Sequence, residues 1–491
     1  MVVVSIYGVY TFLGIINEEI KGGWMSVLQD HGCDIVVSKD QLVNFFTDGC
    51  RSYSDTKVGL ESERFCYKIE NNKPLEYSGS RSIHGILEYL SCNCEYSPVY
   101  ENDSIVGLTT EIGGSVSLEP GCQVEFASAP VRTLRELQSQ IDKFSYDMKR
   151  VADYFNIGYL FIGSTPDWGL KDIPHVPKDR YKIMRGYMPL VGDSGLDMMF
   201  RTCSTHISLD FTSESNMVDK FRLASRLHFV VAAILASSPF LNGVDQNTLS
   251  VRGRIWDNVD KHRSGIPRCI FEKGFGFERW VDFVMDVPMY FVYRNGQYIP
   301  TEGHSFRDFL SGSNSCVSGY PTFTDWANHV TTVFTDVRIK KYLEIRSADS
   351  IPENLQVALV ALWLGIMDDH DILGEVTEMV SDWTYEYCMQ LQRHSFDRGI
   401  HTEIAKHGSI KALLNTLLEF ASNGLEKRRH ALGLEYDEVE YLDSLRRILV
   451  DGKSYSEVMH ELYHGVWRKD VSKLYAVYGS GSLHDSIYMG A

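Results

Sequence analysis

Alternating apolar and polar positions predict β-strands along roughly the first two thirds of the chain. In residues 58–65, Val58 and Leu60 lie on one face while Glu61 and Glu63 share the other. The same period of two, or a short apolar run, recurs in residues 157–164, 201–211, 286–299 and 338–349. From about residue 352 the pattern becomes helical, with an apolar stretch followed by amphipathic runs near 371–392, 409–424 and 453–467. The chain is therefore expected to have an α+β fold with a helical C-terminal half.

A long amphipathic helix is predicted for residues 134–155. Thr133 followed three residues later by Glu136 is a capping-box signature. Behind it, apolar residues recur at spacings of three and four: Leu134, Leu137, Ile141, Phe144, Met148, Val151 and Phe155. A coiled-coil seam would need partner helices, so packing of this stripe against the sheet is preferred. A second core helix is predicted for residues 216–236, ending before Pro239.

Residues 104–130 contain a predicted hairpin whose loop length decides which side chains share a face. Apolar and polar residues alternate on both sides of the Pro120-Gly121 turn. A two-residue loop would place Glu119 and Glu125 on opposite faces. A three-residue loop would pair Glu119 with Gln123 and put both glutamates on one face. We prefer this second register because it gathers Val116, Leu118, Val124 and Phe126 on the other face, where they can pack.

The composition is that of an ordinary globular protein with an acidic balance of charge. Of 491 residues, 44% are hydrophobic and 23% charged, and the formal net charge is -17. Nucleic-acid and anionic-membrane binding need basic surface, so neither partner is expected. The ten cysteines show no repeated C-x-x-C spacing, which favours reduced thiols in a cytoplasmic protein. No apolar run reaches the about 18 residues that a membrane-spanning helix needs.

Two parts of unequal size are expected. Residues 1–40 are interpreted as an N-terminal extension of unknown role, because their apolar segment has no preceding Lys or Arg and no convincing cleavage site for export. Residues 41–491 are expected to form a single domain whose helical part begins at about residue 352. No internal repeat, low-complexity tract or obvious linker divides them.

Five glutamates on the polar faces of the predicted strands suggest a metal site. They are Glu61, Glu63, Glu119, Glu125 and Glu344, the last of which shares a strand face with Arg346. Gathered without compensation, such carboxylates would repel one another and their pKa values would rise. Divalent cations relieve that repulsion, and ligands that are all oxygen select Mg²⁺ or Mn²⁺. The alternative is a set of solvated surface glutamates.

Basic residues gather in residues 249–263 of this acidic chain, where Arg252 and Arg254 occur with Trp256. The planar donor fork of arginine suits a phosphate or carboxylate, although a solvated basic loop is an equal alternative. His206, on the polar face of residues 201–211, is by itself more typical of a structural residue than of a ligand. No GxxxxGK[ST] loop is present, so bound ATP would be held by metal and sheet.

The order of the longer motifs resembles that of one enzyme family. The chain contains VGLESERF, SLEPGCQVEFASAP, RYKIMRGYMP, GLDMMFRTCSTHISLDF, SVRGRIWDNVDKHR, FGFERWVDFVMDVPMYFVYRNG, DWANHVTTVF and KKYLEIRSAD. These motifs are similar to those of glutamate-cysteine ligases of the plant and alphaproteobacterial type. The resemblance runs from about residue 40 to about residue 467.

This resemblance implies a glutamine-synthetase-like fold, in which a mainly antiparallel sheet forms a funnel packed with helices. It also implies an ATP-dependent ligase that joins the γ-carboxylate of L-glutamate to the amine of L-cysteine through γ-glutamyl phosphate. That reaction is the first step towards glutathione. The implied substrates are L-glutamate, L-cysteine and ATP, the implied cofactor is Mg²⁺ or Mn²⁺, and the enzyme would be a monomer or homodimer.

The resemblance also assigns roles to residues. The family's metal-binding motifs fall on Glu61, Glu63, Glu119, Glu125 and Glu344. Its substrate-site segments fall on Arg180, Arg185, Arg252, Trp256, His206 and Gln123. Arg252 and Arg346 are the expected catalytic arginines, which would neutralise charge during phosphoryl transfer.

The chain departs from the family pattern at several positions. Cys122 replaces a glycine of the hairpin turn, which would cost about 1–2 kcal/mol if a left-handed conformation is needed there. Of a regulatory cysteine pair found in plant members, only Cys316 is matched, because the partner position is Thr301. A redox switch of that kind is therefore not expected. The alternatives are a related ligase that joins glutamate to another amine and a non-catalytic relative, against which the five glutamates argue.

Overall fold

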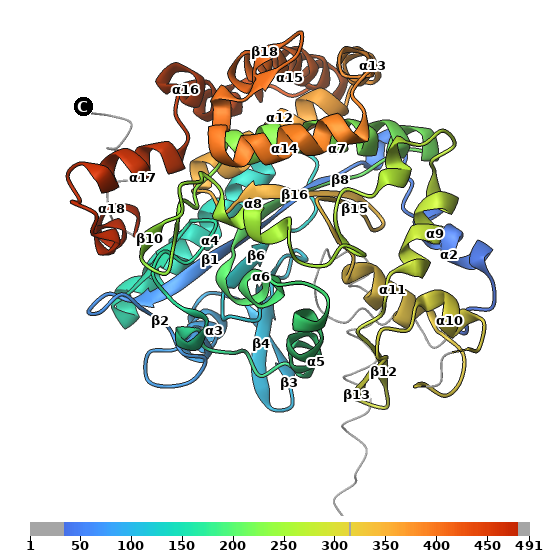
Figure 1. Ribbon diagram of the computed structural model, residues 1–491, viewed down its shortest axis with the longest axis horizontal. Helices are drawn as coiled ribbons and strands as arrows, with labels where there is room; N and C mark the ends of the chain where they lie inside the picture. Colours follow the sequence, from blue (N-terminus) through green and yellow to red (C-terminus); the bar gives the residue numbers. More distant parts are fainter. Residues whose placement is uncertain (1–33, 314–315, 480–491) are drawn as a thin grey trace, which may run out of the picture.

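Residues 34–313 and 316–479 are described by the computed structural model (Figure 1). Most of the extension predicted for residues 1–40 therefore lies outside the described residues. The first helix of the described residues is α2 (Lys39–Thr47), which begins where the Ser38 side chain accepts a hydrogen bond from the backbone of Gln41.

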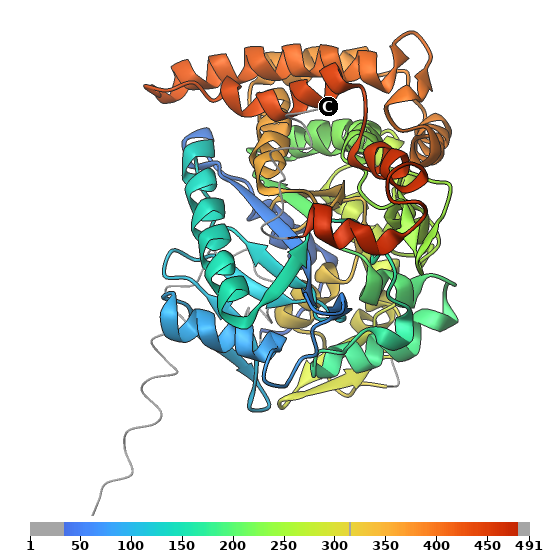
Figure 2. The same cartoon turned by 90° about the vertical axis from the view of Figure 1, so that its left-hand side faces the viewer.

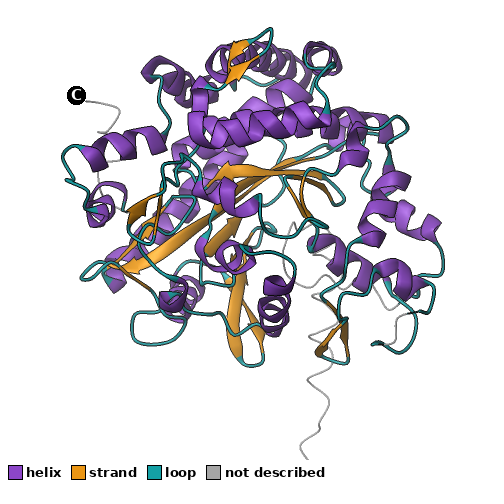
Figure 3. Cartoon of the chain, viewed as in Figure 1, coloured by secondary structure: helices purple, strands orange, loops and turns teal. Residues whose placement is uncertain are grey.

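A single large antiparallel sheet forms the centre of the described chain (Figure 3). Its ten strands are β1 (Val58–Lys68), β2 (Lys73–Pro74), β3 (Ser97–Glu101), β4 (Ser104–Thr109), β5 (Ser115–Leu118), β6 (Val124–Ala127), β7 (Ile157–Leu160), β8 (Ser204–Leu209), β15 (Val337–Ile339) and β16 (Leu343–Asp349). The strand order is β15-β16-β8-β1-β6-β5-β4-β3, and β2 and β7 pair with the end of β1. The predicted antiparallel sheet is confirmed.

The hairpin of β5 and β6 has the three-residue loop. Ser117 lies opposite Glu125, and beyond the strands the Glu119 amide donates to the Gln123 carbonyl at 3.0 Å. The Cys122 amide donates a hydrogen bond to the Glu119 carbonyl at 2.9 Å, and Cys122 has a left-handed φ of 66°. This register places Glu119 and Glu125 on the same face, as the alternation predicts, and the left-handed position falls on the residue that replaces glycine.

We expect Cys122→Gly to be more stable than Cys122→Ala by about 1 kcal/mol. Both variants lose the buried thiol, so the comparison isolates the backbone preference for a left-handed conformation. Urea denaturation of the two variants measures the difference. If the alanine variant proves equally stable or more so, the turn carries no strain at this position.

The apolar face of the sheet is covered by two helices, α4 (Leu134–Phe155) and α12 (Glu353–Met367). Phe126 of β6 stacks on Phe144 of α4, with ring centroids 4.6 Å apart. Gln356 of α12 donates to the Ser62 hydroxyl at 2.8 Å. Figure 2 shows α4, in teal, running along one side of the sheet. The predicted packing of the 134–155 helix against the sheet is confirmed, so the glutamate-bearing face is turned the other way.

Further helices and small sheets complete the part of the chain before residue 352, with one more small sheet in the C-terminal part. The helices are α3 (Ile83–Asn93), α5 (Asp179–Tyr187), α6 (Gly195–Arg201), α7 (Glu214–Ile234), α8 (Val251–Trp256), α9 (Phe277–Asp286), α10 (Phe306–Leu310) and α11 (Phe323–Thr331). The small two-stranded sheets pair β9 (Phe240–Leu241) with β10 (Val244–Asp245), β11 (Ser264–Gly265) with β14 (Phe334–Thr335), β12 (Phe291–Arg294) with β13 (Gln297–Pro300), and β17 (Glu403–Ile404) with β18 (Gly408–Ser409). The aromatic segment 286–299, in which Asn295-Gly296 predicts a hairpin turn, forms the separate β12–β13 hairpin, so that turn is confirmed.

The C-terminal part is helical, as predicted, and caps one end of the sheet in Figure 1. Its further helices are α13 (His370–Met379), α14 (Tyr385–Arg398), α15 (Ile410–Leu432), α16 (Asp443–Asp451), α17 (Tyr455–His464) and α18 (Leu474–Tyr478). The run predicted near 371–392 is two helices, because the chain turns between α13 and α14. In the described part of the chain, no helix combines the length and apolar character needed to cross a membrane.

Candidate active site

A cavity opens on the polar face of the sheet where β1, β8 and the β5–β6 hairpin meet. Cross-strand pairing places Glu61 opposite His206 and Glu63 opposite Glu125. The residues that line the cavity include Glu61, Glu63, Glu119, Gln123, Glu125, Arg180, His206, Trp256, Arg338, Lys340 and Arg346. Four of the five predicted glutamates therefore face one cavity, and the fifth, Glu344, is buried beside it.

Glu61, His206 and Glu344 form a first cluster, called here the balanced cluster because cations compensate its charge. Ligating atoms of all three lie within 4.8 Å of one another. Glu344 is bound by Arg338 at 2.6 Å, Lys340 at 3.1 Å and Arg346 at 3.1 Å.

The cations set the protonation of the balanced cluster. Burial acts to raise the pKa of Glu344, but the charges of Arg338, Lys340 and Arg346 outweigh it and hold that pKa well below its usual value. Burial, followed by the charge of Arg346, lowers the pKa of His206 to about 4. The carboxylates of this cluster are therefore ionised and the imidazole neutral at neutral pH.

Glu63, Glu119 and Glu125 form a second cluster, called here the acidic cluster. Burial, with the charge of Glu119 second, raises the pKa of Glu63 to about 8. Burial and the charges of its glutamate neighbours also raise the pKa of Glu125 well above its usual value. Hydrogen bonds from the Ser204 amide to Glu63 and from the Ser117 hydroxyl to Glu125, both 2.7 Å, offset only part of this cost. The charge of Arg252 also acts to lower the pKa of Glu63, but burial and the neighbouring carboxylates outweigh it.

The predicted arginines occupy three different settings. Arg180 of α5 and Arg346 of β16 line the cavity. Arg185, in the last turn of α5, is exposed and is not among the lining residues.

Arg252 lies at the edge of the site, behind a β-bulge in β16. The pairing of β16 with β8 shifts between Ile345 and Ala348, so the residues between them have no partner in the ladder. The buried Arg252 guanidinium donates to the carbonyls of Arg346 at 2.8 Å and Ser347 at 3.2 Å. It does not line the cavity. Its contacts hold the backbone that carries Arg346.

Gln123 and Trp256 both reach the cavity, with different amounts of freedom. The Gln123 amide is used within the protein, since it accepts from the Gly121 amide at 2.8 Å and donates to the Thr202 carbonyl at 3.0 Å. Trp256 packs near Arg252, whose guanidinium carbon is 5.7 Å from its ring centroid. Its buried Nε1 has no hydrogen-bond acceptor among the described residues. The Trp256 indole could therefore donate a hydrogen bond to a bound ligand without breaking one within the protein.

Several residues of the site were not singled out from the sequence. Arg338 and Lys340 belong to the RIKKYLEIRSAD segment, which was predicted as one strand but turns between β15 and β16, so that Arg338 lies opposite Glu344. Period two alone would have put Ser204 on the same face as His206. Lys178, whose Nζ donates to the Leu118 carbonyl at 3.0 Å, carries no pattern that distinguishes it from a surface lysine.

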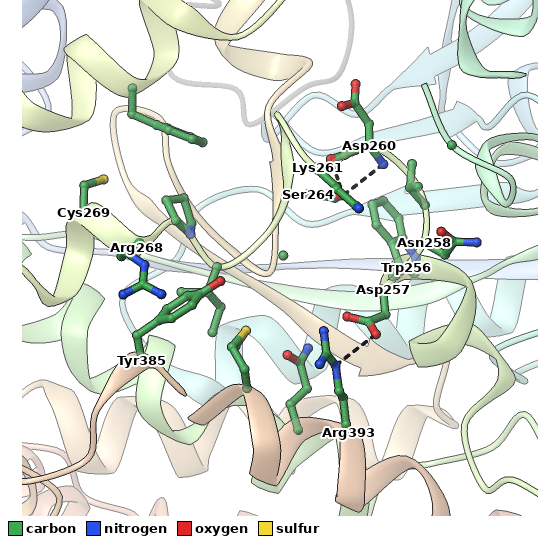
Figure 4. A pocket seen from close by; sticks show the side chains of 18 of the residues that line it. Trp256, Asp257, Asn258, Asp260, Lys261, Ser264, Arg268, Cys269, Tyr385 and Arg393 are labelled. Atoms are coloured by element: carbon green, nitrogen blue, oxygen red, sulfur yellow. Dashed lines mark hydrogen bonds and ion pairs between the residues drawn. The ribbon is translucent and has the colours of Figure 1, made fainter. Parts of the chain in front are cut away.

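A larger cavity of about 1070 Å³ adjoins the first, and Trp256 lines both. Figure 4 shows that Trp256 and Asp257 stand on one side of it, and Arg268 and Tyr385 on the other. Arg393 binds Asp257 at 3.3 Å across part of its wall. None of the five glutamates lines this larger cavity.

Comparisons with known proteins identify the family of this chain. The chain matches the model of glutamate-cysteine ligase family 2 over residues 57–477. It is 40% identical over 440 residues to the chloroplastic glutamate-cysteine ligase of Nicotiana tabacum, covering 89% of this chain and 82% of that relative. The corresponding enzyme of Arabidopsis thaliana is 37% identical over 440 residues, with the same shares covered.

Solved structures give a weaker match. A glutamate-cysteine ligase from Francisella tularensis in complex with AMP has a TM-score of 0.49 and 10% identity, covering 85% of this chain and 87% of that chain. The family assignment therefore rests on the sequence matches alone.

The expected cytoplasmic location is wrong. The similar curated ligases of tobacco, barrel medic, rice and Arabidopsis are all chloroplastic, which points to a plastid. The prediction relied on the spacing of the cysteines, which was interpreted as that of reduced thiols. Reduced thiols do not distinguish one reducing compartment from another.

Proposed function

Because this chain belongs to glutamate-cysteine ligase family 2, we propose that the cavity lined by its glutamates is the active site. The protein is an ATP-dependent glutamate-cysteine ligase, and it catalyses the first step of glutathione synthesis. The observation that carries the site assignment is the convergence of Glu61, Glu63, Glu119 and Glu125 with Arg346 on one cavity. Residues 41–491 are taken as one catalytic domain in this proposal.

The acidic cluster fits a divalent cation of the Mg²⁺ or Mn²⁺ type. Glu63, Glu119 and Glu125 supply only oxygen ligands, which these ions prefer. Burial and mutual repulsion raise the pKa values of Glu63 and Glu125, and a bound cation would offset both effects. Glu61, His206 and Glu344 are candidates to hold a further ion, since their ligating atoms converge and the imidazole is neutral. Bound metal would supply charge neutralisation for the phosphates of ATP.

The cations of the balanced cluster are the proposed phosphate contacts. Arg338, Lys340 and Arg346 all bind Glu344, so a divalent ion on that carboxylate would free their donors for phosphate oxygens. Transfer of the γ-phosphoryl group to the substrate's γ-carboxylate spreads negative charge over oxygens that such donors can meet.

Substrate carboxylates are proposed to bind at the part of the cavity lined by Arg180 and Trp256. Arg180 lines it from α5, and Trp256 offers a buried Nε1 that no described residue accepts from. Arg252 is proposed to act as a positioning residue, because it holds the carbonyls of Arg346 and Ser347. Arg185, which is exposed, would contact a substrate only if α5 moved.

The activity itself is tested by ADP release from ATP. We expect release with L-glutamate and L-cysteine together, and little with either alone. A panel of other amines in place of cysteine tests the alternative that this ligase uses a different amine. Faster ADP release with another amine than with cysteine would favour that alternative.

We expect oxidant and thiol reductant to leave activity and the monomer-dimer distribution nearly unchanged. Thr301 occupies the position of the partner cysteine, and it is fully buried, with its hydroxyl donating to the Met289 carbonyl at 2.6 Å. Activity assays and size-exclusion chromatography with and without reductant measure the effect. A reductant-reversible change that disappears in Cys316→Ser would show that another cysteine has replaced the missing partner.

A further inference from the structure

Helix α17 carries a His-Glu-x-x-His sequence that the ligase site does not use. Its residues are His460, Glu461 and His464. A spacing of four residues places both imidazoles on one face of a helix, which is the spacing with which helices hold Zn²⁺ through two histidines. The two ring centroids are 6.4 Å apart.

A carboxylate from a distant part of the chain lies against both rings. Asp245, at the end of β10, has one oxygen 3.0 Å from Nε2 of His460 and the other 2.9 Å from Nε2 of His464. The side chains of Asp245 and His460 are only 10% and 22% exposed. The His464 side chain is 55% exposed, so an ion could reach the cluster from solvent.

Hydrogen bonding within the protein leaves this cluster incomplete. Nε2 of His460 is shielded from solvent and makes no hydrogen bond to any described residue, although an Asp245 oxygen is close. The His460 ring nitrogen and the Asp245 oxygen therefore lie 3.0 Å apart without a hydrogen bond between them. A cation bound between the two atoms would give both a partner.

We propose that His460, His464 and Asp245 bind a divalent transition-metal ion of the Zn²⁺ class. Two imidazole nitrogens and one carboxylate oxygen are a Zn²⁺ ligand set, whereas Mg²⁺ prefers oxygen alone. As placed, these three residues do not bring one ligating atom each within 4.8 Å of one another, so binding requires the two rings to turn towards a common point. The site is separate from the glutamate cavity and does not rest on the function proposed for that cavity.

The ion is structural, not hydrolytic. Glutamate is the general base in hydrolases with this motif, but Glu461 is exposed and its carboxylate is held by Lys453 at 2.6 Å. The metal would instead join α17 to the β9–β10 hairpin.

That junction braces the segment that leads into the active site. Ser456 of α17 donates to the Leu249 carbonyl at 2.5 Å and accepts from the Ser238 amide at 3.0 Å. Ser238 in turn donates to Asp349, at the end of β16, at 2.6 Å. A metal on α17 would therefore stabilise the start of α8, the helix that carries Arg252.

The test titrates Zn²⁺ into the full-length protein after chelation, with excess Mg²⁺ present to compete for the all-oxygen ligands. We expect wild-type protein to bind one more Zn²⁺ ion than the His460→Ala/His464→Ala double variant. Zn²⁺ should raise the midpoint of thermal unfolding of wild type but not of the double variant. Asp245→Asn, which preserves shape, should weaken the same binding event at least about 10-fold.

His84→Ala is the matched control, because His84 on α3 also lies 3.3 Å from a carboxylate, that of Glu88 one turn later. It should bind as many Zn²⁺ ions as wild type. Equal Zn²⁺ binding by wild type and the double variant would overturn the proposal, as would loss of the ion in His84→Ala. If the double variant does not fold, the Zn²⁺ titration of Asp245→Asn is the deciding measurement. An unchanged Zn²⁺ affinity in that variant would overturn the proposal.

Discussion

Glu119→Gln is expected to lower kcat/KM at least about 10³-fold, which corresponds to roughly 4 kcal/mol of lost transition-state stabilisation. The substitution removes one negative charge from the acidic cluster at nearly constant shape, so a divalent ion would lose a ligand while the cavity keeps its form. Steady-state ADP release across a range of Mg²⁺ concentrations measures the effect.

The fold should survive this change. Glu119 holds the hairpin through its backbone, and its carboxylate makes no hydrogen bond or ion pair with the residues that the structure describes. Its charge instead raises the pKa values of Glu63 and Glu125, so thermal stability should be unchanged or slightly higher. Glu111→Gln, the same chemical change at an exposed position before β5, is the control and should keep wild-type activity. Wild-type turnover of Glu119→Gln at limiting Mg²⁺ would remove Glu119 from the metal site.

Gly424→Ala is expected to lower the free energy of unfolding by about 3 kcal/mol or more. Helices α12 and α15 pack backbone to backbone at this point, and a Cβ on Gly424 would lie far inside contact distance of the Gly365 carbonyl oxygen. The opposing atom belongs to a buried helix backbone, which cannot move aside as a flexible side chain can. Urea denaturation followed by circular dichroism gives the change.

Gly374→Ala is the control for helix propensity. Gly374 lies within α13, is exposed, and has open space where a Cβ would stand. Alanine there should be neutral or should stabilise the protein by about 0.5–1 kcal/mol. Equal stability of the two alanine variants would mean that α12 and α15 can separate at little cost.

Alternation along single strands predicted much of the candidate site. Period two put Glu61 beside Glu63 on one face, and the need for a packable apolar face selected the loop that aligns Glu119 with Glu125. These are local properties of a strand or hairpin. The sequence therefore contains them without knowledge of the neighbouring strands.

Properties that depend on distant contacts were harder to predict. The division into balanced and acidic clusters follows from which cations lie across the sheet from which carboxylate, and cross-strand register between β15 and β16 decides that. The position of Arg252 depends on a bulge in β16, where the carbonyls of Arg346 and Ser347 accept hydrogen bonds from its guanidinium. Arg185 belongs to a promising motif, but the helix rotation that exposes it is set by packing.

The central position of β1 has a consequence for how the chain is made. β1 pairs with β6, β7 and β8, all of which follow it in the sequence, and its pairing with β8 extends to Leu209. At a synthesis rate of about 5–20 residues per second, the strand that carries Glu61 and Glu63 waits on the order of ten seconds for its last neighbour. During that time its backbone donors and acceptors are open to other chains. Folding yield during synthesis should therefore depend on chaperones that cover β1 until residue 209 has left the ribosome.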